Sequence, residues 1–119
     1  MTLHEIKGIL NAFVLARNDA MGVDIDRAYC ADLMSDVLAF SITNSLLITG
    51  LTNAQVIRTA EVADIKAILF VQNKRPDVET IALAEGKKIP LLVTDVSMFD
   101  ACGRLYEKGL RSRSADTDF

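Results

Sequence analysis

Short apolar runs alternate with amphipathic segments along the second half of the chain. The runs are SLLIT at 45–49, KAILFVQ at 66–72 and IPLLVT at 89–94. Continuous apolar runs of this length are typical of strands that are buried on both faces of a parallel sheet. A stretch with helical spacing of its apolar positions follows each run. The pattern therefore predicts successive strand–helix units, with these three strands adjacent in a mostly parallel sheet.

Capping side chains indicate where the helices begin. Thr2 and Glu5 have the spacing of a capping box ahead of a helix that we expect over residues 3–11. The helices expected after the three apolar runs have candidate caps of their own: Thr52 with Gln55, Pro76 or Asp77, and Asp95. Gly86 suits the end of the helix after the second run.

The first half of the chain is less regular. AFVLA at 12–16 predicts a short strand, and residues 28–31 predict an extended segment. SDVLAF at 35–40 predicts a short helix, with Ser35 or Asp32 as its cap. These elements complete a single-domain α/β fold, in which helices pack on a mostly parallel sheet built from βα units.

Length and charge narrow the class of protein. A chain of 119 residues with 50% hydrophobic residues suits one domain, which we place at residues 1–110, with a disordered polar tail at 111–119. The net charge is -3, which argues against a dedicated nucleic-acid binder and against docking on an anionic membrane. The N-terminus has no signal-peptide pattern, so we expect a cytoplasmic protein.

The chain carries little catalytic chemistry. His4 is the only histidine, and Cys30 and Cys102 lie far apart, so we expect two buried reduced thiols and neither a metal site nor a catalytic residue. No glycine-rich phosphate loop is present. The pairs Lys74–Arg75 and Lys87–Lys88 are interpreted as solvated loop charges. Nothing in the sequence identifies a cofactor.

Ligands of open α/β sheets bind at the carboxyl ends of the strands. Three pairs of residues follow the apolar runs at these ends: Thr49–Gly50, Gln72–Asn73 and Thr94–Asp95. Of these, Thr49, Gly50, Thr94 and Asp95 are our candidate ligand-binding residues, although Asp95 also suits a plain helix cap.

The segment YCADLMSDVLAF at 29–40 resembles the signature of the DRTGG domain family. That signature has an aromatic residue followed by S-D-x-L-S-D-V-M. Five positions match it, and Ala31 replaces the first serine: Tyr29, Asp32, Ser35, Asp36 and Val37. Residues 65–90 and 89–110 are similar to the middle and C-terminal units of the family. Arg27 and Ala28 stand where the family has its glycine pair, which would let backbone amides approach a ligand or a neighbouring strand.

The resemblance implies a non-catalytic regulatory or interaction module that senses a small molecule or nucleotide and docks onto a partner enzyme. Asp32, Ser35 and Asp36 are then further ligand-binding candidates. The alternative is a small metal-dependent phosphotransferase or hydrolase, which would use Asp32, Asp36 and Asp95.

Apolar residues between Tyr29 and Ile42 lie on more than one side of the short helix, so they cannot all face one core. Exposed apolar surface of this kind usually marks an interface. We expect a homodimer with Met34 or Leu38 at its seam, and with a ligand pocket between the subunits. A different protein that covers the same surface is the alternative.

Overall fold

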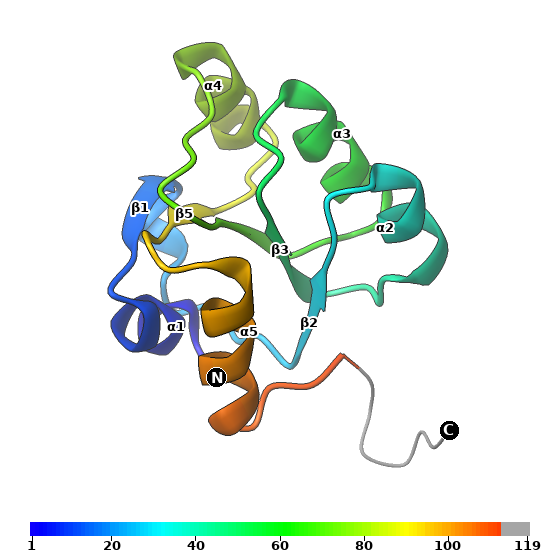
Figure 1. The fold of residues 1–119 in the computed structure, drawn as a ribbon. Helices are drawn as coiled ribbons and strands as arrows, with labels where there is room; N and C mark the ends of the chain where they lie inside the picture. Colours follow the sequence, from blue (N-terminus) through cyan, green and yellow to red (C-terminus); the bar gives the residue numbers. More distant parts are fainter. Residues whose placement is uncertain (113–119) are drawn as a thin grey trace.

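The computed structural model describes residues 1–112, which form a five-stranded sheet between two layers of helices (Figure 1). The strand order is β1-β5-β4-β3-β2. Four neighbouring strands run parallel, and β1 pairs antiparallel with β5 at one edge. The strands span the following residues: β1 Phe13–Ala16, β2 Arg27–Cys30, β3 Ser45–Thr49, β4 Ala67–Phe70 and β5 Leu91–Val93. The predicted α/β class and the adjacency of the three apolar strands are confirmed.

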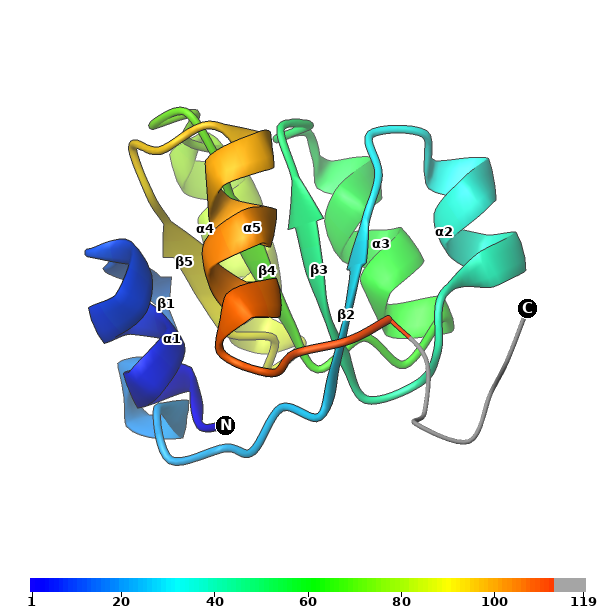
Figure 2. The same cartoon turned by 60° about the horizontal axis from the view of Figure 1, so that its bottom comes forward.

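The helices divide between the two faces of the sheet (Figure 2). Helices α1 and α5 cover one face, and α2, α3 and α4 cover the other. Their bounds are α1 Leu3–Leu10, α2 Met34–Phe40, α3 Ala54–Val62, α4 Val78–Gly86 and α5 Met98–Glu107, with a short 3₁₀ turn at Asn18–Ala20. The three helices that link β2, β3, β4 and β5 share one face because successive right-handed crossovers all proceed in the same direction across the sheet. Within the described residues, no helix has the length and apolar character needed to cross a membrane.

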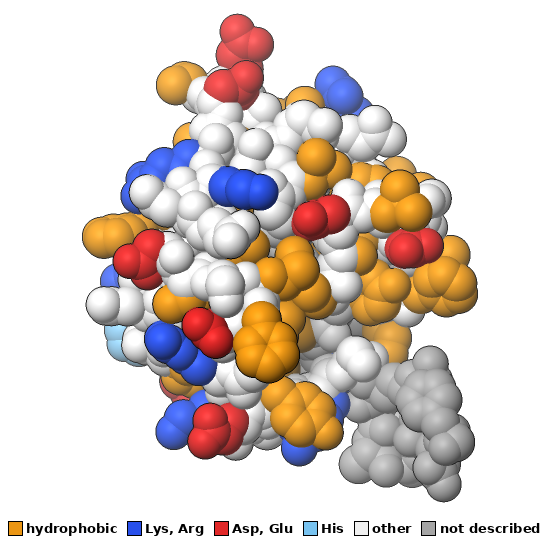
Figure 3. Space-filling view, viewed as in Figure 1, with side chains coloured by type: hydrophobic (Ala, Val, Ile, Leu, Met, Phe, Trp, Pro, Cys, Tyr) orange, Lys and Arg blue, Asp and Glu red, His pale blue; other side chains and the backbone are white. Residues whose placement is uncertain are grey.

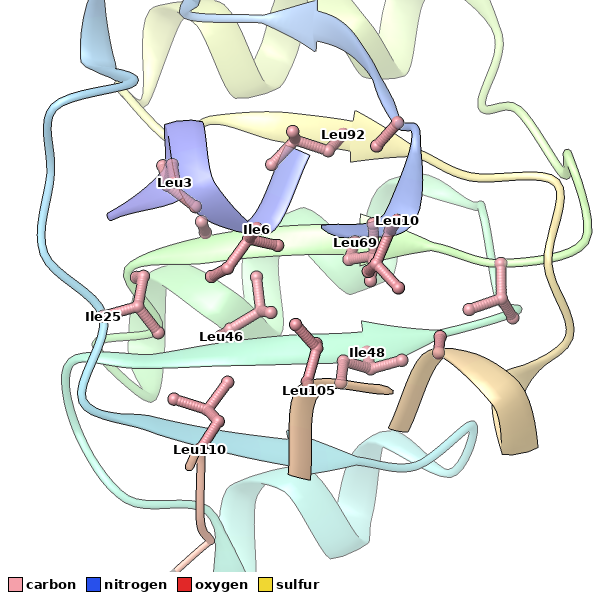
Figure 4. Close-up of a cluster of buried hydrophobic side chains, with 14 residues drawn as sticks. Leu3, Ile6, Leu10, Ile25, Leu46, Ile48, Leu69, Leu92, Leu105 and Leu110 are labelled. Atoms are coloured by element: carbon pink, nitrogen blue, oxygen red, sulfur yellow. The ribbon is translucent and has the colours of Figure 1, made fainter. Parts of the chain in front are cut away.

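Alternation along the strands produces two apolar cores. On β3, Leu46 and Ile48 point toward α1 and α5, whereas Leu47 points toward α2 and α3. The first core combines Leu46 and Ile48 with Leu3 and Ile6 of α1 (Figure 4). Every residue of β3, β4 and β5 is buried, as their continuous apolar sequences predict.

The predicted helix caps are partly right. Thr2 and Glu5 form the capping box of α1, and Asp77 accepts from the Thr80 amide at the start of α4. Two predicted caps are wrong, because the helices begin one or two residues later than expected. Asn53 caps α3 and Ser97 caps α5, in place of Thr52 and Asp95. A polar side chain one or two positions along can cap a helix that begins correspondingly later, so spacing alone does not choose between the candidates.

Two further expectations need correction. Helix α2 has Leu33 at its N-cap position with no side-chain cap, so neither Ser35 nor Asp32 caps it. Arg111 belongs to the fold and not to a tail, since its carbonyl accepts from the Ala28 amide at 3.0 Å, beside the outer edge of β2. Residues 113–119 of the expected tail lie outside the described residues.

A buried hydrogen bond holds α1 to the end of β5. The Thr94 hydroxyl donates to the Leu10 carbonyl at 2.7 Å, which satisfies a carbonyl in the last turn of α1. We expect Thr94→Val to lower the free energy of unfolding by about 1–3 kcal/mol, because valine leaves the buried carbonyl without a partner. Urea denaturation measures the change.

Thr43→Val is the matched control, since Thr43 is exposed and its side chain makes no hydrogen bond with the described residues. This variant should stay within about 0.5 kcal/mol of the wild type. Equal stabilities of the two variants would contradict a structural role for the Thr94 bond.

Candidate functional site

The carboxyl ends of β2 and β3 meet at one carboxylate. Asp32 lies two residues after β2, and its Oδ1 accepts from the Thr49 hydroxyl at 2.9 Å and from the Gly50 amide at 2.8 Å. The Thr49 hydroxyl also accepts from the Leu51 amide at 3.1 Å. Three of the predicted ligand-binding residues, Asp32, Thr49 and Gly50, are therefore brought together. The Oδ2 of Asp32 takes no hydrogen bond from residues 1–112, and Asp32 is exposed.

Gly50 lies close to two opposite charges. A side chain at this position would place its Cβ 3.4 Å from Lys74 Nζ and 3.7 Å from both carboxylate oxygens of Asp32. Lys74 and Asp32 are near each other across this glycine, yet they form no ion pair. The absence of a side chain at position 50 thus leaves room for an ammonium group and a carboxylate group close to the same stretch of backbone. We refer to Asp32, Gly50 and Lys74 as the carboxyl-edge cluster.

Lys74 is the functional candidate that the sequence analysis missed. It was interpreted as a solvated loop charge beside Arg75. Its position two residues after the apolar run that contains β4 was the available signal, because residues that follow neighbouring parallel strands gather at one edge. The loop is fixed by Gln72 and Asn73, which both have positive φ, at 57° and 55°. The amides of these two residues donate to carbonyls just after β5, and the Lys74 ammonium group that follows them lies close to Gly50.

The predicted residues on β5 lie apart from this cluster. Strand β4 separates β5 from β3, and the Thr94 hydroxyl is buried against Leu10. The backbone there is also occupied, since the Asn73 amide donates to the Thr94 carbonyl at 2.8 Å. Asp95 is exposed beyond the strand. Thr94 therefore has a structural role in this fold, and Asp95 is the only one of the pair with a free side chain at the surface.

Ser35 and Asp36 lie in the first turn of α2, next in the chain after Asp32. Ser35 is exposed and Asp36 is half-buried, and neither side chain hydrogen-bonds to the described residues. They are therefore close in sequence to Asp32 of the carboxyl-edge cluster. Among residues 1–112, no three histidine, cysteine, aspartate or glutamate side chains are grouped as metal ligands.

Two other sequence expectations concern the outer strand β2. Arg27 and Ala28, which replace the family's glycine pair, lie at its start beside Arg111 and away from its carboxyl end. Cys30 ends the strand with an exposed side chain, so the expectation of two buried thiols is wrong for this residue. Cys102, on α5, is half-buried.

Comparisons with known proteins are informative about the fold. No protein-family model matches the chain, and no curated protein matches it. A crystal structure does resemble it: that of the CBS and DRTGG domains of the regulatory region of Clostridium perfringens pyrophosphatase, complexed with its activator, diadenosine tetraphosphate. The TM-score is 0.75 at 19% sequence identity, over 87% of this chain and 45% of the other. The chain thus spans less than half the length of that protein, and the two share an α/β fold.

Removal of the Asp32 carboxylate tests the hydrogen bonds that join β2 to β3. We expect Asp32→Ala to lower the free energy of unfolding by about 1 kcal/mol, because the Thr49 hydroxyl and the Gly50 amide both lose their acceptor. Asp32→Asn should cost less, since its amide oxygen still accepts. Urea denaturation provides the comparison.

Asp36→Ala serves as the control, because Asp36 is also an aspartate near the start of α2 but its side chain has no partner among the described residues. We expect a change of only a few tenths of a kcal/mol from the lost interaction with the helix dipole. If Asp32→Ala were no more destabilised than Asp36→Ala, the proposed link between the two strands would be contradicted.

Proposed function

We propose that this chain is a non-catalytic regulatory module of the cytoplasm that senses a nucleotide at the carboxyl-edge cluster. The observation that supports this most directly is that the charged groups of Asp32 and Lys74 both lie close to Gly50. An acceptor and a cation that flank bare backbone suit a ligand with hydroxyl groups at one end and phosphate at the other. Nucleotides have this combination.

Each group of the cluster has a defined part in the proposed complex. The free Oδ2 of Asp32 accepts a hydrogen bond from a ribose hydroxyl, while Oδ1 stays bound to Thr49 and Gly50. Lys74 binds phosphate oxygens through its ammonium group. Position 50 must remain without a side chain, because the ligand passes over its backbone at close range. Ser35 and Asp36 extend the site along α2.

The comparison supports a sensing role. The protein of similar fold is a regulatory region, and its structure was solved with a nucleotide activator. The resemblance of residues 29–40 to the DRTGG signature includes Asp32, which lies in the cluster. The alternative hypothesis, a metal-dependent enzyme, required Asp95 close to Asp32 and Asp36. Asp95 follows β5, two strands away from β3, so this arrangement does not favour it.

The outer face of α2 supports a second part of the proposal, a homodimer. Leu33, Leu38 and Phe40 are exposed, Leu38 by 53% and Phe40 by 68%. Figure 3 shows hydrophobic side chains gathered over α2, at the right of the view. Asp36 is the only charged residue on this helix, so two copies can approach without strong repulsion.

Met34 and Leu38 were the two predicted interface residues. Met34 is only 7% exposed and packs in the core beneath α2, so the proposed seam rests on Leu38 with Leu33 and Phe40. The partner enzyme that the sequence analysis expected would contact the dimer on another face. If α2 proves to bind that enzyme instead, the chain alone will be monomeric.

Nucleotide binding is tested by thermal denaturation of the full chain with ATP, AMP and diadenosine tetraphosphate. At about 100-fold excess over Kd, a bound ligand should add about 2.7 kcal/mol and raise Tm by on the order of 10 °C. Lys74→Ala should weaken the affinity about 10- to 100-fold, because a charged hydrogen bond to phosphate is lost. Isothermal titration calorimetry measures Kd.

Lys87→Ala is the control for charge. Lys87 lies between α4 and the start of β5, at the amino ends of the parallel strands and away from the carboxyl-edge cluster. Its Nζ pairs there with a carboxylate oxygen of Glu61 at 3.2 Å. This variant should bind as the wild type does. Binding that is weakened equally by both substitutions would indicate a general effect of charge, and the absence of any nucleotide-dependent shift would rule out the sensing proposal.

The dimer is tested by light scattering of the wild type and of Leu38→Asp. We expect twice the chain mass of 13.0 kDa for the wild type and a monomer for the variant, because a buried carboxylate at the seam is not compensated. Val78→Asp is the control, since Val78 is an exposed apolar residue at the start of α4, on another helix. A monomeric wild type would contradict the proposed assembly.

A further inference from the structure

Arg75, the residue after Lys74, is held by two contacts with its surroundings. Its Cζ lies over the Phe13 ring, 5.8 Å from the ring centroid. Its Nε donates to the Asn73 Oδ1 at 3.2 Å. Arg75 is exposed, and it forms no ion pair among the described residues. The guanidinium is therefore oriented through one nitrogen and one ring, and its two Nη groups remain available to an anion.

Phe13 brings this contact to the carboxyl edge of the sheet. Strand β1 runs antiparallel to β5, and Phe13, its first residue, pairs with Val93, the last residue of β5. The start of β1 thus lies beside the carboxyl ends of the parallel strands. Phe13 is 64% exposed, so the ring is not enclosed in either core. What the ring offers instead is an aromatic face that attracts the guanidinium and limits its orientations.

The loop that carries Lys74 and Arg75 is fixed on both sides. The Asn73 amide donates to the Thr94 carbonyl at 2.8 Å, and the Lys74 amide donates to the Val71 carbonyl at 3.1 Å. Pro76, directly after Arg75, is buried. A ligand that meets this loop does not have to order its backbone first, which reduces the entropic cost of binding.

The side chains of Lys74 and Arg75 diverge from neighbouring backbone positions. The Lys74 ammonium group lies close to Gly50, which follows β3, whereas the Arg75 guanidinium lies over Phe13 of β1. In the sheet, β3 is on one side of β4, and β5 and β1 are on the other. Two cations that diverge in this way favour a chain of phosphate groups over a single phosphate group.

We propose that Arg75 is a specificity-determining residue that binds the distal phosphate of a nucleotide, so that the site prefers nucleoside triphosphates to monophosphates. This inference rests on the proposed nucleotide site and extends it. Lys74 binds the phosphate nearest the ribose, and the two Nη groups of Arg75 bind oxygens at the far end of the chain. Phe13 and Asn73 are positioning residues, because they orient the guanidinium and act on the ligand only through it.

Isothermal titration calorimetry of the full chain with AMP, ADP and ATP tests this preference. We expect the affinity to rise from AMP to ATP. Arg75→Ala should weaken ATP binding about 10- to 100-fold and leave AMP binding unchanged, because only the distal phosphate loses its charged hydrogen bonds. Lys74→Ala should weaken the binding of all three nucleotides.

Arg104→Ala is the control for the loss of an arginine. Arg104 is exposed on α5, in the second half of that helix, and forms no ion pair with residues 1–112. This variant removes the same charge and should bind ATP as the wild type does. Equal weakening by Arg104→Ala and Arg75→Ala would contradict a specific contact.

Variants of Phe13 test the positioning role. Phe13→Leu keeps an apolar side chain but removes the aromatic face, so ATP binding should weaken about 2- to 5-fold while AMP binding stays the same. Phe13→Tyr retains the aromatic face and should restore the wild-type affinity for ATP. Since the position is exposed, both variants should keep a Tm close to that of the wild type. An unchanged ATP affinity in Phe13→Leu would refute the positioning role.

Failure of this inference can be told apart from failure of the proposed function. If AMP and ATP bind equally well, and Arg75→Ala binds both as the wild type does, the nucleotide site stands and the preference for triphosphates is overturned. Inorganic tripolyphosphate is the probe without a nucleoside. If no nucleotide binds, but tripolyphosphate binds and loses affinity in Arg75→Ala, the nucleotide sensor fails and the role of Arg75 in binding a phosphate chain is supported. If tripolyphosphate does not bind either, both proposals are wrong.

Discussion

Every side chain of β3, β4 and β5 is buried, so this sheet has no face that can meet water. A helical layer is therefore required on each side. The connections between β2 and β5 supply only one of these layers, because all three place their helices on the same face. Helices α1 and α5 must come from the two ends of the strand–helix series to cover the other. The position of nearly every remaining element follows from this requirement.

The same constraint produces the carboxyl-edge cluster. Parallel strands that lie side by side bring their following loops to one edge, so Asp32, Gly50 and Lys74 arrive from three successive connections. Buried strands leave polar side chains only at their ends. Polar side chains at these ends that form no hydrogen bond with the backbone are available to a ligand. The Thr94 hydroxyl donates to the Leu10 carbonyl, whereas the Lys74 side chain forms no such bond with the described residues.

The sequence predicted the fold well where the signal is local. Continuous apolar runs identified β3, β4 and β5, and side-chain spacing identified the caps of α1 and α4. It failed where a contact between distant segments decides the outcome. The sequence position of Asp32 predicts a helix cap. In the structure its carboxylate instead accepts hydrogen bonds from the Thr49 hydroxyl and the Gly50 amide.

The candidate site could not be predicted in full for a related reason. Lys74 looked like any loop lysine, because its neighbour across Gly50 comes from a segment far earlier in the chain. Only the strand order, β4 beside β3 beside β2, makes the two charges neighbours.

The antiparallel pairing of β1 with β5 has a consequence for how the molecule is assembled during synthesis. Each parallel unit, from β2 to β5, can form against a strand that emerged shortly before it. In contrast, β1 pairs with β5, and Leu10 of α1 bonds to Thr94, which lies 84 residues later in the chain. Of the described elements, α1 and β1 are the earliest in the chain and among the last to find their partners. Loop closure over that separation favours slow completion of the layer formed by α1 and α5. Until then, one face of the nascent sheet stays exposed, and this is the stage at which aggregation is most favoured.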